Sequence, residues 1–142
     1  MGSRKAETGD VPMKIPKPNR EEIVQRALSL VGAPSSFPRS EKSRDCMDLA
    51  LFAYDYQMKR PDNNENPFLA RSSMVKEFLR ESRWKLVEAP LPGDALFFLV
   101  STGWHFGIYV GNDRFVHAGN GAFTTSLLSR WRRYLRGCYS WR

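Results

Sequence analysis

The stretch GWHFGIYVGNDRFVHAGNG, at residues 103–121, contains both histidines of the chain. Two runs of alternating apolar residues flank the turn-forming residues at 111–113, which is the pattern of a β-hairpin. Because side chains alternate faces along a strand, His105, Gly107 and Tyr109 share one face of this hairpin. Two histidines on one hairpin, in a chain with no others, point to a shared task.

The length of the turn decides whether the two histidines meet. A three-residue loop pairs Val110 with Arg114. The same register pairs Gly107 with His117 and places His105 diagonal to His117, with about 7–8 Å between Cα atoms. A two-residue loop would place the two histidines on opposite faces. The first register is the one in which the two imidazoles can act together.

Around the hairpin, the sequence predicts helices first and strands later. Apolar residues follow helical spacing at about 19–32, 45–58 and 72–81. Asn19 is placed as an N-cap, with Glu22 three residues later as in a capping box. Short β-rich runs follow, separated by turn residues: WKLVEA, DALFFLV, HFGIYV, RFVHA, AFTT and GCYSW. Helices followed by strands without alternation predict an α+β fold with an antiparallel sheet.

The composition suits one globular domain. The chain has 142 residues, of which 42% are hydrophobic and 26% charged, as in proteins with a single core. We expect a flexible, polar, proline-rich tail over 1–18 and one domain over 19–142, present as a monomer. No apolar run approaches the ~20 residues of a membrane span. The tail is not a secretory signal peptide as it stands.

The chain is strongly basic, with a net charge of +7, and the segment RWRRYLRGCYSWR at 130–142 contains five arginines and no acidic residue. Such a surface fits polyanions such as nucleic acid, anionic lipid or the bacterial wall. A solvated basic face without a partner is the alternative. The arginines follow no zinc-finger, homeodomain or RNP-like pattern, so we expect no specific nucleic-acid partner.

Two cysteines are too few for a disulfide framework. Cys46 opens the second predicted helix, where backbone N–H groups and the helix dipole stabilise a thiolate. A base oriented by a second polar group could activate this thiol, and the paired histidines offer both groups. The alternative is that Cys46 is a small core residue, which is also our expectation for Cys138. The cysteines and carboxylates are not in ligand-like spacing around the histidines, so we expect no metal and no organic cofactor.

Four segments in order resemble the NlpC/P60 family of papain-like cysteine peptidases: DCMDLALFAY, PGDALFF, HFGIYVGNDRFVHAGN and SRWRRYLRGCYSW. The resemblance extends from about residue 21 to residue 141. It implies a papain-like fold in which N-terminal helices pack on a C-terminal antiparallel sheet. It also implies a peptidoglycan hydrolase with Cys46 as nucleophile, His105 as base and His117 as the polar third member of a triad.

The same resemblance implies a substrate. Such enzymes cut the peptide stems of peptidoglycan, often between D-glutamate and diaminopimelate. Asp45 matches the family's aspartate before the cysteine, which helps to hold the substrate. Ser35 stands where the family often has a tyrosine with a similar task. Arg44 and Arg39, in the preceding loop, could meet a carboxylate of diaminopimelate; solvated loop residues are the alternative.

Our interpretation is a cysteine endopeptidase that cleaves the γ-D-glutamyl–diaminopimelate bond. It would act in the periplasm or cell wall, reached by secretion or by delivery as an effector or phage-borne enzyme. One rival is a thiol amidase or acyltransferase on another substrate, because related folds handle lipids. The other is a non-catalytic basic module that binds the wall or nucleic acid. A pure binder needs no reactive Cys46, so the reactivity of that thiol separates the last rival from the enzymes.

Overall fold

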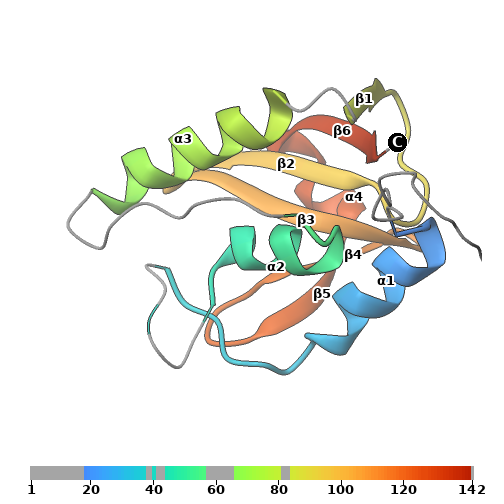
Figure 1. Cartoon of the computed structure of the whole chain (residues 1–142), viewed down its shortest axis with the longest axis horizontal. Coiled ribbons are helices and arrows are strands. Elements are labelled where there is room, and N and C mark those ends of the chain that lie inside the picture. The colour runs from blue at the N-terminus through green and yellow to red at the C-terminus, as the bar shows by residue number, and fades with distance from the viewer. Residues whose placement is uncertain (1–17, 38–39, 41–43, 57–65, 81–83, 142) are drawn as a thin grey trace, which may run out of the picture.

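The computed structural model describes residues 18–37, 40, 44–56, 66–80 and 84–141 (Figure 1). Most of the predicted N-terminal tail lies outside these residues; Pro18, its last residue, is buried. Three helices come first: α1 (Arg20–Ser29), α2 (Cys46–Ala53) and α3 (Pro67–Arg80). The remaining elements are β1 (Trp84–Val87), β2 (Ala95–Val100), β3 (Gly103–Gly111), β4 (Arg114–Ala118), β5 (Phe123–Leu127), α4 (Leu128–Trp131), the 3-10 turn η1 (Arg132–Tyr134) and β6 (Leu135–Trp141).

The strands form one six-stranded sheet in the order β1-β6-β2-β3-β4-β5, and every neighbouring pair is antiparallel. Helices α1, α2 and α3 lie on one side of the sheet, and α4 lies on the other (Figure 1). The predicted α+β architecture, with N-terminal helices on a C-terminal antiparallel sheet, is therefore confirmed.

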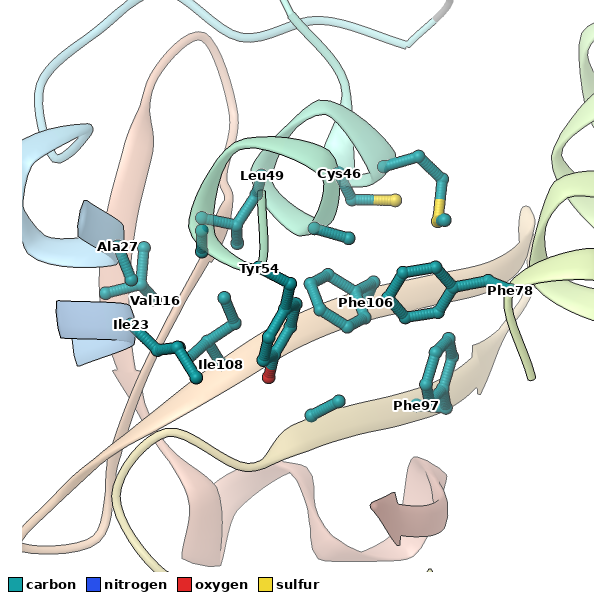
Figure 2. Packing of buried hydrophobic residues seen from close by; sticks show 14 of the residues in the cluster. Ile23, Ala27, Cys46, Leu49, Tyr54, Phe78, Phe97, Phe106, Ile108 and Val116 are labelled. Atoms are coloured by element: carbon teal, nitrogen blue, oxygen red, sulfur yellow. The ribbon is translucent and has the colours of Figure 1, made fainter. Parts of the chain in front are cut away.

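Two apolar clusters hold these layers together. The larger cluster fills the space between the helices and the sheet (Figure 2), where its labelled members are Ile23, Ala27, Cys46, Leu49, Tyr54, Phe78, Phe97, Phe106, Ile108 and Val116. The smaller cluster lies on the opposite face, under α4, and its buried members are Leu96, Phe98, Phe115, Leu128 and Cys138. Cys138 is thus a core residue, as predicted.

Polar side chains set the starts of the first two helices. The side chain of Asn19 accepts a hydrogen bond from the backbone N–H of Glu22, and the Asn19 N–H donates to the Glu22 carboxylate. This confirms the predicted capping box. Asp45 and Asp48 form a second capping box, so α2 begins at Cys46.

Two helices differ from their predicted lengths. Helix α2 ends at Ala53, and Asp55 has a left-handed backbone with φ of 53°, which stops the helix before the predicted end near 58. Residues 57 and 58 lie outside the described part of the chain. Helix α3 begins at Pro67, five residues before its predicted start. Proline favours the first helical position because its missing N–H has no helical partner there.

The hairpin turn is shorter than predicted. Asn112 and Asp113 have φ values of 52° and 60°, which is the conformation of a two-residue type I′ turn. The turn pairs Gly111 with Arg114, so the expected pairing of Val110 with Arg114 was wrong.

A β-bulge shifts the pairing of β3 with β4 by one residue. The pairing shifts between Tyr109 and Gly111, so that Val110 has no partner on β4. The bulge supplies the extra residue that a longer loop would have supplied. Gly107 therefore still pairs with His117, as predicted.

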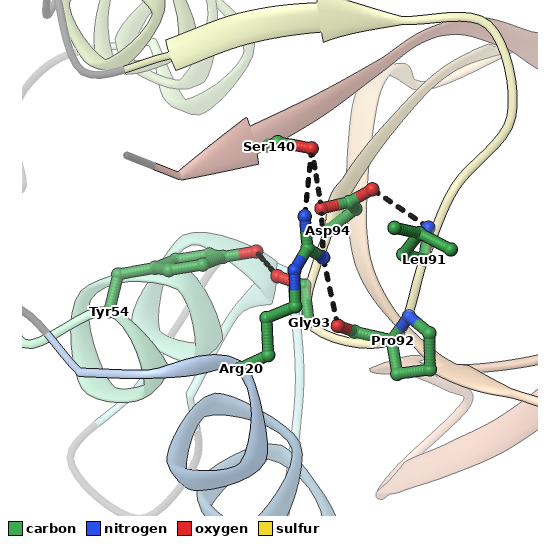
Figure 3. Close-up of polar contacts among 7 residues, drawn as sticks. All are labelled: Arg20, Tyr54, Leu91, Pro92, Gly93, Asp94 and Ser140. Atoms are coloured by element: carbon green, nitrogen blue, oxygen red, sulfur yellow. Dashed lines mark hydrogen bonds and ion pairs between the residues drawn. The ribbon is translucent and has the colours of Figure 1, made fainter.

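A buried aspartate joins α1 to β6 and to the turn before β2 (Figure 3). Oδ1 of Asp94 accepts hydrogen bonds from Arg20 at 2.6 Å and from the Ser140 hydroxyl at 2.8 Å. Its Oδ2 accepts the N–H of Leu91 at 2.8 Å. Asp94 is 1% exposed, so these donors replace the water that its carboxylate loses on folding.

Asp94→Ala should destabilise the fold by about 3 kcal/mol, because it leaves a buried hydroxyl and a backbone N–H without their acceptor. Urea denaturation followed by circular dichroism would measure the change. Glu77→Ala is the matched control, since Glu77 is exposed on α3 and its loss should change stability by less than about 0.5 kcal/mol. Equal stability of the two variants would contradict this role of Asp94.

Candidate active site

Cys46 is the first residue of α2, and the capping box places it there. Oδ1 of Asp45 accepts the N–H groups of Met47 at 3.1 Å and Asp48 at 3.2 Å. The Cys46 side chain lies in the larger apolar cluster (Figure 2), and the residue is 1% exposed. The helix N-terminus favours a negative charge at this position, which is the charge that a reacting thiolate carries.

The two histidines come together as predicted. Nε2 of His105, on β3, lies 2.8 Å from Nδ1 of His117, on β4. The two rings are nearly perpendicular, with an angle of 87° between their planes. Gly107 pairs with His117, and a Cβ there would lie 2.7 Å from the Phe115 ring, so this position has no room for a side chain.

Ser126 continues the hydrogen-bonded contacts of the two histidines. Its role was not predicted from the sequence. Its hydroxyl oxygen lies 2.7 Å from Nε2 of His117. The predicted strand ended at residue 125, whereas β5 continues to Leu127. Thr124 pairs with His117, so Ser126 lies two residues further on the same face, in diagonal reach of the imidazole. We call His105, His117 and Ser126 the histidine–serine chain.

The direction of the hydrogen bonds in this chain decides what His105 can do. When the Ser126 hydroxyl donates to His117, the His117 ring donates to Nε2 of His105, and the His105 proton resides on Nδ1. When the direction is reversed, His105 donates from Nε2 and Ser126 accepts from His117. Only this second arrangement leaves a lone pair on Nδ1 of His105, so that the ring can act as a base.

Aromatic side chains enclose both imidazoles. Trp131, on α4, stacks on His105 with ring centroids 5.6 Å apart and an angle of 22° between planes. The same indole meets the edge of His117 at 5.0 Å. Phe98 packs beside His105 and Phe115 beside His117. His117 is therefore buried, with 4% of its surface exposed, whereas His105 is half-buried.

This enclosure makes both histidines weak bases. Burial, then the neighbouring His117 and then Arg71 lower the pKa of His105 from 6.5 to about 3. Burial lowers the pKa of His117 from 6.5 to about 4. Both rings are therefore neutral at pH 7, and a neutral His105 has the lone pair that a general base needs.

The thiol and the histidines lie in different layers of the fold. Helix α2 packs against β3 and β4. Cys46 belongs to the cluster on the helix side of the sheet, whereas His105 packs with Phe98 and Trp131 on the other side. The described contacts of His105 include no hydrogen bond to Cys46. Catalytic pairs can be longer than a hydrogen bond until substrate binds, so this contact stays a prediction.

The three predicted substrate-binding residues surround the start of α2. Asp45 is 6% exposed and serves as the N-cap described above. Ser35 is 3% exposed and donates its hydroxyl proton to the Gly119 carbonyl at 2.9 Å, so only its oxygen lone pairs remain for a ligand. Arg44 is exposed and forms a β-bridge with Ser35. Arg39 lies outside the described residues. The substrate contacts of all four stay predictions.

The described residues contain no group of three or more His, Cys, Asp or Glu side chains close enough to hold a metal ion. The two histidines form a pair that is hydrogen-bonded internally and to Ser126. No helix in the described ranges is long and apolar enough to cross a membrane.

Known proteins resemble this chain in sequence and in fold. The model of the NlpC/P60 family matches residues 34–137. The probable peptidoglycan endopeptidase LytE of Bacillus subtilis (strain 168) is 31% identical over 123 residues, which cover 82% of this chain. The match covers 33% of LytE, so this chain spans about a third of that relative's length.

Solved structures support the fold. NlpC1 from Trichomonas vaginalis gives a TM-score of 0.62 at 20% identity, over 89% of this chain and 47% of that chain. The NlpC/p60 domain of the peptidoglycan hydrolase SagA gives 0.57 at 18% identity, over 87% and 99%. The family match covers most of the chain and includes Cys46 and both histidines. This chain therefore belongs to the NlpC/P60 family.

Proposed function

We propose that this chain is a cysteine peptidase that hydrolyses amide bonds in the peptide stems of peptidoglycan. Membership of the NlpC/P60 family and the likeness to a probable peptidoglycan endopeptidase support this activity. The observation that carries the proposal is the histidine–serine chain, in which His105 on β3 lies 2.8 Å from His117 on the paired strand β4. A nucleophilic thiol needs such an oriented base.

The reaction would proceed in two halves. Nδ1 of His105 accepts the thiol proton of Cys46 while the sulfur attacks the carbonyl carbon, and the backbone N–H of Cys46 donates to the oxyanion. When the tetrahedral intermediate collapses, His105 gives the proton to the leaving amine and a thioester remains. A water molecule, deprotonated by His105, then releases the carboxylate product and restores the thiol.

His117 and Ser126 would act through His105. With Ser126 as acceptor, His117 donates from Nε2 and accepts from His105 at Nδ1. This sequence of hydrogen bonds holds the proton of neutral His105 on Nε2 and directs its Nδ1 lone pair to the thiol. The protein's own residues are sufficient for this reaction, and it requires no cofactor.

The bond that we propose is the γ-D-glutamyl–diaminopimelate amide. Asp45 would pair with an amine of the stem, Arg44 with a diaminopimelate carboxylate, and Ser35 would contribute at the edge of the site. The enzyme would then act on the wall, in the periplasm or outside the cell.

Digestion of purified peptidoglycan, followed by mass analysis of the fragments, tests this proposal. Tripeptide and tetrapeptide stems, free or attached to the sugar, should yield fragments that end in D-glutamate. Cleavage at the sugar–alanine amide would instead identify an amidase. If no stem is cleaved although Cys46 is reactive, the wall is not the substrate.

Ser126→Ala should lower kcat about 10-fold with little change in KM, because the base loses part of its orientation. Ser126→Thr retains the hydroxyl and should recover most of this loss. Thr124→Ala is the matched control, since Thr124 lies on the same strand and is exposed. Rates for each variant across the pH range would check the prediction. A Ser126→Ala enzyme as active as Thr124→Ala would show that Ser126 does not position His117.

A further inference from the structure

Arg71 is a buried cation beside the proposed active site. It lies on α3 and is 7% exposed. The ion pairs among the described residues belong to Arg20 and Arg26, and none involves Arg71. A buried charge without a counter-ion is unfavourable. An anion bound to this guanidinium would therefore stabilise it, and the described part of the chain supplies none.

Two contacts fix the guanidinium in place. Its Nη1 donates to the carbonyl of Trp104 at 3.0 Å. Its central carbon lies 3.6 Å from the centre of the Phe37 ring, a cation–π contact. Its Nε is buried and has no hydrogen-bond partner. The side chain is therefore held on one edge and one face, while the opposite edge, with its Nε–H, is unused.

The unused edge carries the two N–H groups that a carboxylate can bind. Nε and Nη2 of an arginine present two parallel N–H groups, and a carboxylate accepts both at once. Nη1 is already bound to Trp104, so the Nε–Nη2 edge is the one that remains. A carboxylate there would satisfy the orphaned Nε–H and neutralise the buried charge together.

Arg71 lies close enough to His105 to affect the proposed general base. Trp104, whose carbonyl binds Arg71, immediately precedes His105 in β3. Burial and His117 are the larger causes of the lowered pKa of His105, and the positive charge of Arg71 is the third. A carboxylate bound to Arg71 would offset that charge, so it would raise the pKa of His105 and strengthen the base only when substrate is present.

We propose that Arg71 binds a substrate carboxylate beside the scissile amide, and that this group is the α-carboxylate of a γ-linked glutamyl residue. This inference rests on the proposed peptidase activity. A γ-linked glutamate uses its side-chain carboxyl in the amide, so its α-carboxylate remains free on the same residue. Arg71 would thus select γ-glutamyl stems with a free carboxylate and disfavour stems in which that group is an amide.

Three stem peptides test the assignment: one with D-isoglutamate, one with D-isoglutamine at the same position, and one amidated only on diaminopimelate. The wild-type enzyme should cleave the D-isoglutamate peptide with a kcat/KM about 10- to 100-fold above that of the D-isoglutamine peptide, the effect of one charge-assisted hydrogen-bonded pair. In Arg71→Met this ratio should fall to within about 3-fold. Arg71→Lys should keep an intermediate ratio, because it retains the charge without the fork.

Arg80→Met is the matched control, since Arg80 is exposed on the same helix and its variant should keep the wild-type ratio. Circular dichroism and thermal melting would establish that each variant is folded. Binding of the same peptides to Cys46→Ala, by calorimetry, gives the ratio without turnover. If Arg71→Met does not fold, the same binding ratio measured for Arg71→Lys in the Cys46→Ala background tests the role of Arg71.

The outcomes separate the two proposals. Cleavage of all three peptides at similar rates by the wild-type enzyme would overturn the role of Arg71 but leave the peptidase standing. A ratio that survives in Arg71→Met, or that follows amidation of diaminopimelate, would also overturn it. Absence of any cleavage would count against the proposed peptidase, and the binding ratio of Cys46→Ala would still decide the carboxylate site.

Discussion

Cys46→Ala should lower the rate of stem-peptide cleavage by at least about 10⁴-fold, because no other group can form the thioester. The fold should persist. The substitution removes one sulfur atom from the apolar cluster, which costs about 1 kcal/mol. Cleavage assayed by mass spectrometry, with melting curves for both proteins, would separate loss of chemistry from loss of structure.

Cys138 provides the matched control. It is buried in the second cluster, where burial, and then the charge of Asp94, raise the pKa of its thiol. Cys138→Ala should therefore leave cleavage unchanged, and iodoacetamide should modify Cys46 faster than Cys138 near pH 7. Faster modification of Cys138, or a Cys46→Ala protein that still cleaves stems, would remove the thiol from the mechanism.

The sequence predicted those features that local rules determine. Asn19 and Glu22 predicted the start of α1, because a capping box depends only on two residues that are three positions apart. The antiparallel sheet followed from short strands with turn residues between them. The Gly107–His117 pairing was predicted for the wrong reason. A bulge opposite β4 replaced the expected third loop residue, and bulges leave little trace in a single sequence.

Long-range contacts could not be predicted in this way. Ser126 joins the histidines only because β5 continues past residue 125 and pairs with β4. Arg71 reaches Trp104 from another element, and it lay one residue before the helix predicted at 72–81, because α3 begins earlier than its apolar pattern indicated. The basic segment near the C-terminus looked uniform, yet its arginines are exposed at 130, 132, 133 and 136, whereas Trp131 turns inward onto both histidines.

The second large effect concerns the histidines, which should not be equivalent. His105→Ala should lower kcat by about 10³- to 10⁴-fold, because thiol deprotonation and protonation of the leaving amine both fail. His117→Ala should lower kcat only about 10- to 100-fold, because the base is still present and loses its orientation. Steady-state rates on one defined stem peptide, with melting curves for each variant, would measure the ranking.

His117→Asn makes the ranking sharper. An asparagine side-chain oxygen can accept the Nε2–H of His105, so it keeps the direction of the hydrogen bond that frees Nδ1. His117→Asn should therefore be more active than His117→Ala. His105→Asn should stay as inactive as His105→Ala, because asparagine cannot serve as the general base. His117→Ala as inactive as His105→Ala, in a folded protein, would mean that His117 takes part in proton transfer itself. Zinc bound between the two rings in the purified protein would replace this scheme with a metal site, because the nitrogens that now face each other at 2.8 Å would serve as ligands.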